Sequence, residues 1–153
     1  MAIASSGAIS LSDFRTEFVG GSSAISLSNL YRGGSNIRAK AGNNTATNLA
    51  ASVPTSGAID FADFYSQAKG FRFTYTSGAT NQDASNLFGS DYGVNYPKEI
   101  VINSGVELGA TSTGQEALQI NSGLSGSMTI TNNGTLSGAG GSANGGTGGD
   151  AFE

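Results

Sequence analysis

The front of the chain is organised by one repeated stretch, Ser6-Gly7-Ala8-Ile9-Ser10-Leu11-Ser12-Asp13-Phe14. It returns as Ser23-Ala24-Ile25-Ser26-Leu27-Ser28-Asn29-Leu30 and as Ser56-Gly57-Ala58-Ile59-Asp60-Phe61-Ala62-Asp63-Phe64. In each copy a Ser or Asp is followed three positions later by Asp or Asn. This is the spacing of a helix capping box, although these side chains are shorter than the usual Glu or Gln. The isoleucine before each cap and the apolar residue five positions after it form the pattern of a hydrophobic staple.

These signals predict three short capped helices, over residues 10–18, 26–32 and 60–68, each ended by glycine. Helices of this length are not stable alone in water, so their apolar side chains must pack on one another or on a partner. The segment is therefore either a cluster that folds alone or an anchor ordered by its neighbours. The candidate contact residues are Leu11, Phe14, Phe18, Leu27, Leu30, Tyr31, Phe61, Phe64 and Tyr65.

The pattern changes to that of β-structure after Gly70. Residues 71–76 alternate large and polar side chains, as a half-buried strand does. Short β-prone runs separated by glycine follow at residues 99–103, 106–108, 117–121 and 127–131. Two Ile-Asn-Ser-Gly stretches, which begin at Ile102 and Ile120, suggest an 18-residue rung. This region is therefore expected to be a small β-sandwich or a β-solenoid.

The last segment, residues 132–149, contains eight glycines and almost nothing that could fill a core. It is either a flexible linker or the beginning of a polyglycine type II array, in which extended glycine helices pack side by side. Such an array gains order only when many strands pack together. We therefore expect that the chain continues past Glu153 or that the tail is loose.

The expected fold is mixed and mainly β. An N-terminal segment with three short helices (residues 1–70) precedes a β-rich domain (71–131), which leads into the glycine-rich, polyglycine II-like tail (132–153).

Composition excludes several functional classes. The 153 residues include no Cys, His or Trp, which excludes disulfides, thiolate zinc sites and Cys or His nucleophile–base pairs. Residues 73–153 carry Lys98 alone against seven acids, which argues against nucleic-acid binding. The chain has no run of about 18 apolar residues for membrane insertion. Met1-Ala2-Ile3-Ala4 lacks the basic start and the long apolar run of a signal peptide, so we expect no export by the ordinary route. We expect no cofactor, no metal and no enzymatic activity.

Weaker motifs have simpler structural explanations as caps, core or surface. Ser66 and Lys69 have the spacing of some acyl-enzymes, and Asp60 with Asp63 could form an acid–base or Ca²⁺-binding pair. Asp91 and Glu99, near Tyr92 and Tyr96, could form a sugar site. Asn43 and Asn133 begin glycosylation sequons.

Two parts of the chain resemble phage proteins. The repeated opening, with Tyr31-Arg32-Gly33-Gly34 and residues 53–59, resembles the start of many tailed-phage structural proteins. Residues 100–106 through 127–134 are similar to the region before the glycine-rich part of host-specificity proteins and tail-fibre tip adhesins. Together the two matches cover most of the chain between residues 5 and 149.

The resemblance implies a non-enzymatic virion tail component, made in the host cytoplasm, that attaches the phage to the host surface. Its partners would be other tail proteins and a host receptor, either a glycan or an outer-membrane protein, and it would be a homo-oligomer, for which we expect a trimer. Tip adhesins of this kind carry receptor contacts on loops between polyglycine helices. This chain has no obvious distal loops, so no receptor-binding residue is assigned. The alternatives are a structural adaptor that anchors another module and a tail-borne depolymerase.

Overall fold

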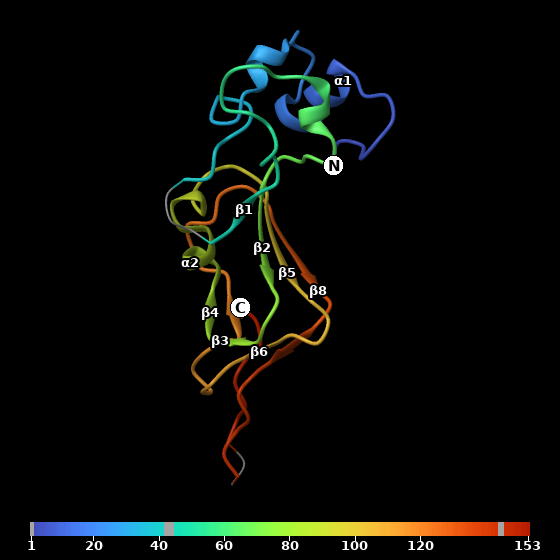
Figure 1. The fold of residues 1–153 in the computed structure, drawn as a ribbon. Coiled ribbons are helices and arrows are strands. Elements are labelled where there is room, and N and C mark those ends of the chain that lie inside the picture. Colours follow the sequence, from blue (N-terminus) through green and yellow to red (C-terminus); the bar gives the residue numbers. More distant parts are fainter. Residues whose placement is uncertain (1, 42–44, 144–145) are drawn as a thin grey trace. The chain divides into compact units, whose positions relative to one another are not determined.

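The computed structural model describes residues 2–41, 45–143 and 146–153. The chain divides into two compact units. Unit 1 consists of Met1–Lys40 and Thr47–Phe71, and unit 2 consists of Ala41–Ala46 and Arg72–Glu153. Figure 1 gives the positions of the labelled elements along the chain.

The three capped helices of unit 1 begin where the repeats predict. Helix α1 (Leu11–Phe14) continues as a π-helical turn, η1 (Arg15–Val19), and two single 3₁₀ turns follow, η2 (Leu27–Leu30) and η3 (Phe61–Phe64). The capping residues are Ser10, Ser26 and Asp60. Their backbone N–H groups donate to the side chain three positions on, at 2.7, 2.9 and 2.9 Å, so the short Asp and Asn side chains do close the boxes.

The predicted lengths of the second and third helices are wrong. Only the first helix ends at glycine, at Gly20 with φ of 79°. The other two stop after one turn because Tyr31 and Tyr65 adopt extended backbone, with ψ of 136° and 132°. A tyrosine at these positions therefore ends the helix before the glycines that follow it.

The core of unit 1 is built from the equivalent residue of each repeat. Phe14, Leu30 and Phe64 are fully buried in one cluster, with ring centroids of Phe14 and Phe64 4.2 Å apart. The staple residues Ile9, Ile25 and Ile59 pack against the same cluster, which confirms the predicted staple pattern. Burying side chains of this size stabilises a fold by about 1.5–3 kcal/mol each.

Unit 2 contains three small sheets, each visited in turn as the chain advances. The first holds β2 (Phe71–Tyr75), β5 (Lys98–Ile102) and β8 (Met128–Asn132); the second holds β3 (Ala79–Thr80), β6 (Glu107–Gly109) and β9 (Thr135–Ser137); the third holds β4 (Gln82–Asp83) and β7 (Leu118–Gln119). Figure 1 shows β2, β5 and β8 side by side.

We call each run of the chain through these sheets a pass. The strand register gives the number of residues that separate one pass from the next. Lys98 pairs with Met128, Leu108 with Leu136 and Leu118 with Phe152, all in parallel. Successive passes are therefore separated by about thirty residues, and the expected 18-residue rung is wrong. Parallel pairing also differs from the antiparallel pairing of a sandwich. The mixed fold with strands predominating is confirmed.

Several short elements were not expected from the sequence. Helix α2 (Ala84–Phe88), the turn η4 (Gly89–Asp91) and strand β1 (Thr47–Asn48) lie in stretches where the sequence predicts neither a helix nor a strand. Asp83 caps α2 by accepting from the Ser85 N–H at 2.7 Å. Strand β9 lies inside the glycine-rich segment. Each of these elements is five residues or shorter, which is too short to leave a periodic pattern.

Candidate functional site

The nine candidate contact residues of unit 1 divide by exposure. Phe14, Phe18, Leu30 and Phe64 are buried within unit 1. Leu27, Tyr31 and Tyr65 are half-buried. Leu11 and Phe61 are 38% and 37% exposed. An attachment surface on unit 1 can therefore use the last two most directly, because large exposed apolar side chains are common at sites of association.

Tyrosine hydroxyls join the repeats in a consistent order. Tyr31, after the second repeat, donates to the carbonyl of Gly57 at the start of the third. Tyr65, after the third repeat, donates to the carbonyl of Gly7 at the start of the first, at 2.5 Å. The two donor tyrosines hold the same position in their repeats, and the two acceptor glycines hold the same position in theirs. The first repeat has Arg15 at the tyrosine position and continues as a helix instead.

The exposed residues also share one repeat position. Leu11 and Phe61 are each the first residue of their helix, as is the half-buried Leu27. The Phe61 ring leans on the buried Phe14 ring, with centroids 5.0 Å apart. The repeat therefore gives unit 1 one apolar side chain per copy, exposed or half-buried, at the start of each helix.

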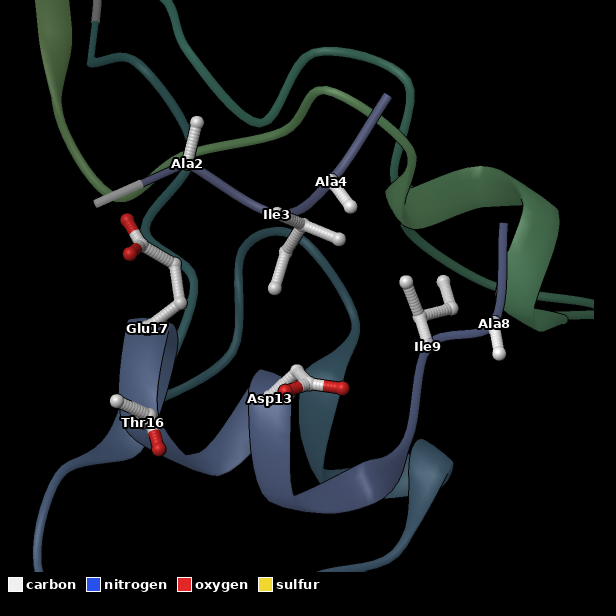
Figure 2. A pocket seen from close by; sticks show the side chains of 8 residues that line it. All are labelled: Ala2, Ile3, Ala4, Ala8, Ile9, Asp13, Thr16 and Glu17. Atoms are coloured by element: carbon white, nitrogen blue, oxygen red, sulfur yellow. The ribbon is translucent and has the colours of Figure 1, made fainter. Parts of the chain in front are cut away.

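A cavity of about 330 Å³ lies beside the first helix, between Ala2, Ile3 and Ala4, Ala8 and Ile9, and the helical residues Asp13, Thr16 and Glu17 (Figure 2). Hydrogen bonds from the Ser10 side chain and backbone lower the pKa of Asp13. The Glu17 Oε1 atom accepts from the Lys69 N–H at 2.7 Å. Both carboxylates thus already hold backbone groups of unit 1.

The weaker motifs are occupied by structural contacts. Asp60 and Asp63 form the third capping box, and the Lys69 Nζ atom donates to the Phe18 carbonyl at 3.3 Å. Ser66 adopts a left-handed backbone with φ of 61°. The sequon residue Asn43 lies outside the described residues.

The residues of the possible sugar site around Tyr92 are also engaged. Asp91 is fully buried and accepts from the Ala41 N–H at 2.9 Å, while Glu99 forms an ion pair with Arg72 at 2.7 Å. The Tyr92 hydroxyl donates to the Asn121 carbonyl at 2.5 Å, and burial together with the charge of Asp83 raises the pKa of Tyr92. Tyr92 and Tyr96 are each 5% exposed, so neither presents an open ring face.

Within unit 2, the glycine-rich segment extends away from the strands after β9 (Thr135–Ser137) and then runs back towards them (Figure 1). The Gly149 N–H donates to the Ala139 carbonyl at 2.8 Å. A Cβ atom on Gly138 would collide with the Gly149 carbonyl oxygen, and one on Gly141 would collide with that of Gly146. The returning chain then places Phe152 beside Leu118 of β7. The sequence shows that this segment is rich in glycine, but it does not show that the segment folds back on itself.

The third pass through the sheets carries partly uncovered apolar residues. The inward residues of the second pass, Ile100 and Leu108, are fully buried. Their partners in register, Ile130 and Leu136, are only half-buried, and Phe152 is 48% exposed. Across residues 2–41, 45–143 and 146–153, no helix is long and apolar enough to span a membrane, and no cluster of three or more acidic side chains could hold a metal ion.

Comparison with known proteins identifies unit 2. Residues 70–153, more than half of the chain, match the family model described as phage tail fibre adhesin Gp38. No curated protein and no solved structure matched the chain. The match includes the strands and the glycine-rich segment, whereas the repeats of unit 1 lie outside it, and their resemblance to tail proteins stays a prediction. The chain therefore belongs to the phage tail fibre adhesin Gp38 family and is a tail fibre-type protein of the phage virion.

Proposed function

We propose that this chain is a non-enzymatic adhesin whose unit 1 joins it to the tail and whose glycine-rich segment contacts a host-surface receptor. The observation that carries the proposal is the family match over residues 70–153. Membership of a tail fibre adhesin family implies contact with other tail components and with host receptors. The assignment of each role to one part of the chain is our inference.

The structure of unit 2 suits a role in which its strands hold the receptor-contacting, glycine-rich segment in place. We infer that the three passes form a short β-solenoid, because strands from successive passes pair in parallel and in register. We also infer that residues 138–143 and 146–150 pack in the manner of polyglycine II, because their backbones approach as closely as only glycine permits.

Unit 1 supports the attachment role through its exposed Leu11 and Phe61 side chains. A homotrimer would present three receptor-contacting segments from one fibre. Several weak contacts held together raise overall avidity without a strong single site. The expected effect is multivalent adsorption.

The experiment removes the glycine-rich excursion alone. Because Gly138 lies against Gly149 and Asp150, residues 139–149 can be deleted by joining Gly138 directly to Asp150. Purified particles that carry the deleted protein should contain it at the normal level, as measured by quantitative mass spectrometry. They should adsorb to the host much less than wild-type particles.

Two results would contradict the proposal. Absence of the wild-type protein from purified particles would exclude a virion role. Normal adsorption by particles that carry the deleted protein would favour the alternative, a structural adaptor in which this segment only spaces the next module.

A further inference from the structure

A second cavity, of about 280 Å³, lies in unit 2 where the first and second passes meet. Its lining residues are Asn81, Gln82, Asp83, Gly114, Gln115, Glu116 and Gln119. Strands β4 and β7 bring the two sides together, because Asp83 pairs with Gln119 in parallel register. Its volume is close to the lower end of the range for small-molecule pockets, about 300 Å³.

The walls of this cavity are held in place by the protein itself. The Asn81 side chain donates to Thr111 Oγ1 at 2.6 Å and accepts from the Thr111 N–H at 2.9 Å. The Tyr75 hydroxyl donates to Gln82 Oε1 at 3.0 Å, and burial raises the pKa of Tyr75, which keeps it a donor. The lining is therefore pre-organised, which lowers the entropic cost of binding a ligand.

Three polar side chains remain available to a ligand. Within the described residues, the Glu116 carboxylate and the Gln119 amide make no side-chain hydrogen bond, although both residues are half-buried. Gln115 accepts from the hydroxyls of Thr111 and Ser112 at 3.0 and 3.3 Å, which leaves its Nε2 atom as a donor. The lining thus offers one strong acceptor, the Glu116 carboxylate, together with two amide groups.

The charges of the lining select the class of ligand. Asp83 already accepts from the Ser85 N–H and from Asn121 Nδ2 at 2.7 and 2.6 Å, so Glu116 is the uncommitted carboxylate. A Ca²⁺ ion takes six to eight oxygen ligands, commonly from several carboxylates, and is poorly served here. An anionic ligand would face two carboxylates and no lysine or arginine in the lining.

The geometry points to a neutral saccharide as the ligand of this cavity. Glu116 would accept hydrogen bonds from sugar hydroxyls, and the amides of Gln115 and Gln119 would donate to ring and hydroxyl oxygens. Identifying this sugar as part of a host-surface glycan rests on the proposed adhesin function. Saccharide binding by the cavity does not.

The test uses the full 153-residue chain labelled with ¹⁵N and titrated separately with maltose, lactose and N,N′-diacetylchitobiose at millimolar concentration. At least one disaccharide should shift the amide signals of residues 81–83 and 114–119. Sialyllactose, which adds a carboxylate to lactose, should bind more weakly than lactose. Glu116→Gln should weaken binding about tenfold, the effect of one charge-assisted hydrogen bond.

A steric variant separates this cavity from binding elsewhere. A Cβ atom at Gly114 would meet no atom within 4 Å, so Gly114→Phe can fill the cavity mouth without clashing with the backbone. It should abolish the shifts, whereas the control Ser90→Phe, at an exposed residue of η4, should leave them unchanged. Thermal melting of each variant checks that it is folded.

The outcomes distinguish this inference from the proposed function. It is overturned if none of the neutral disaccharides shifts these signals, or if the shifts persist in Gly114→Phe. Either result leaves the adsorption experiment unaffected. Conversely, loss of the virion role would leave saccharide binding by the cavity standing.

Discussion

At the scale of single residues, Lys98 is the least expected feature of the core. It is 2% exposed and occupies an inward position of β5, beside Ile100 and Ile102 in the alternating pattern. Its ammonium group donates to the carbonyls of Val94, Tyr96 and Ser125 at 2.8, 2.9 and 2.8 Å. A cation that meets three acceptors satisfies the hydrogen-bonding demand that burial creates.

Replacing Lys98 should destabilise the fold strongly. Lys98→Met keeps a long apolar chain but leaves three carbonyls without this donor, and we expect a loss of about 3 kcal/mol in the free energy of unfolding. Urea denaturation measures the loss. The matched control is Arg72→Ala, which removes a basic side chain whose ion pair with Glu99 is partly exposed and should cost less than about 1 kcal/mol. Equal losses in the two variants would contradict this account of Lys98.

A second residue-scale prediction concerns acid stability. Since hydrogen bonds from Ser10 lower the pKa of Asp13 from 3.8, its ionised form stabilises the fold at higher pH, and that contribution is lost as the pH falls through the lowered pKa. Asp13→Asn should keep the capping bond, as Asn29 does in the second repeat at 2.9 Å.

The melting temperature of Asp13→Asn should therefore fall less than that of the wild type between about pH 5 and pH 2. Asp13→Ala, the comparison variant, loses the cap at every pH and should melt lower already at neutral pH. If the melting temperature of Asp13→Asn fell with pH as steeply as that of the wild type, the ionisation of Asp13 would not account for the acid sensitivity.

At the scale of elements, the fold of the glycine-rich segment follows from its glycine content. The segment doubles back because two runs of glycine can approach one another without side chains between them. For this close approach, the position of each glycine therefore matters more than the number of glycines.

Two neighbouring glycines provide a direct test of this packing. Gly141→Ala places a methyl group against the Gly146 carbonyl and should open the segment, whereas Gly140→Ala meets nothing within 4 Å. Limited proteolysis at residues near 138–150 should be faster in Gly141→Ala than in the wild type and unchanged in Gly140→Ala. Equal protection of the two variants would show that the two runs do not pack as described.

At the scale of the whole molecule, the two units are interleaved along the chain. Residues Ala41–Ala46 precede the last part of unit 1 in sequence but belong to unit 2. The Ala41 N–H donates to the buried Asp91, and the Ala46 N–H donates to the Leu87 carbonyl at 3.3 Å. Unit 2 therefore depends on a segment that lies 26 or more residues before its main part.

This arrangement predicts the behaviour of a fragment. A chain of residues 72–153 lacks the Ala41 and Ala46 contacts and should be less stable than unit 2 within the full chain. Amide hydrogen exchange in β5 and α2 should be faster in the fragment than in the 153-residue protein. Exchange at equal rates would show that Ala41–Ala46 contributes nothing to the stability of unit 2.

Much of the local structure was predictable, and the reason is its short range. The caps at Ser10, Ser26 and Asp60 and their isoleucine staples act within six residues, so the sequence pattern contains all the partners. The alternating pattern likewise located β2, and the β-prone runs between glycines located β5 and β8, each to within about one residue. The lengths of η2 and η3 were not predictable, because extended backbone at Tyr31 and Tyr65 ends those turns while the two hydroxyls bond to distant glycine carbonyls.

The candidate sites were less predictable, because their residues come from separate parts of the chain. Nothing near Gln82 or Glu116 indicates that they line one cavity; this follows only from the pairing of β4 with β7. The sequence by itself determined where the three helices of the repeats begin, which of their faces are apolar and where glycine replaces a core. Only the tertiary structure decided the spacing of the passes, the burial of Lys98 and the return of the glycine run, because each depends on contacts between residues distant in sequence.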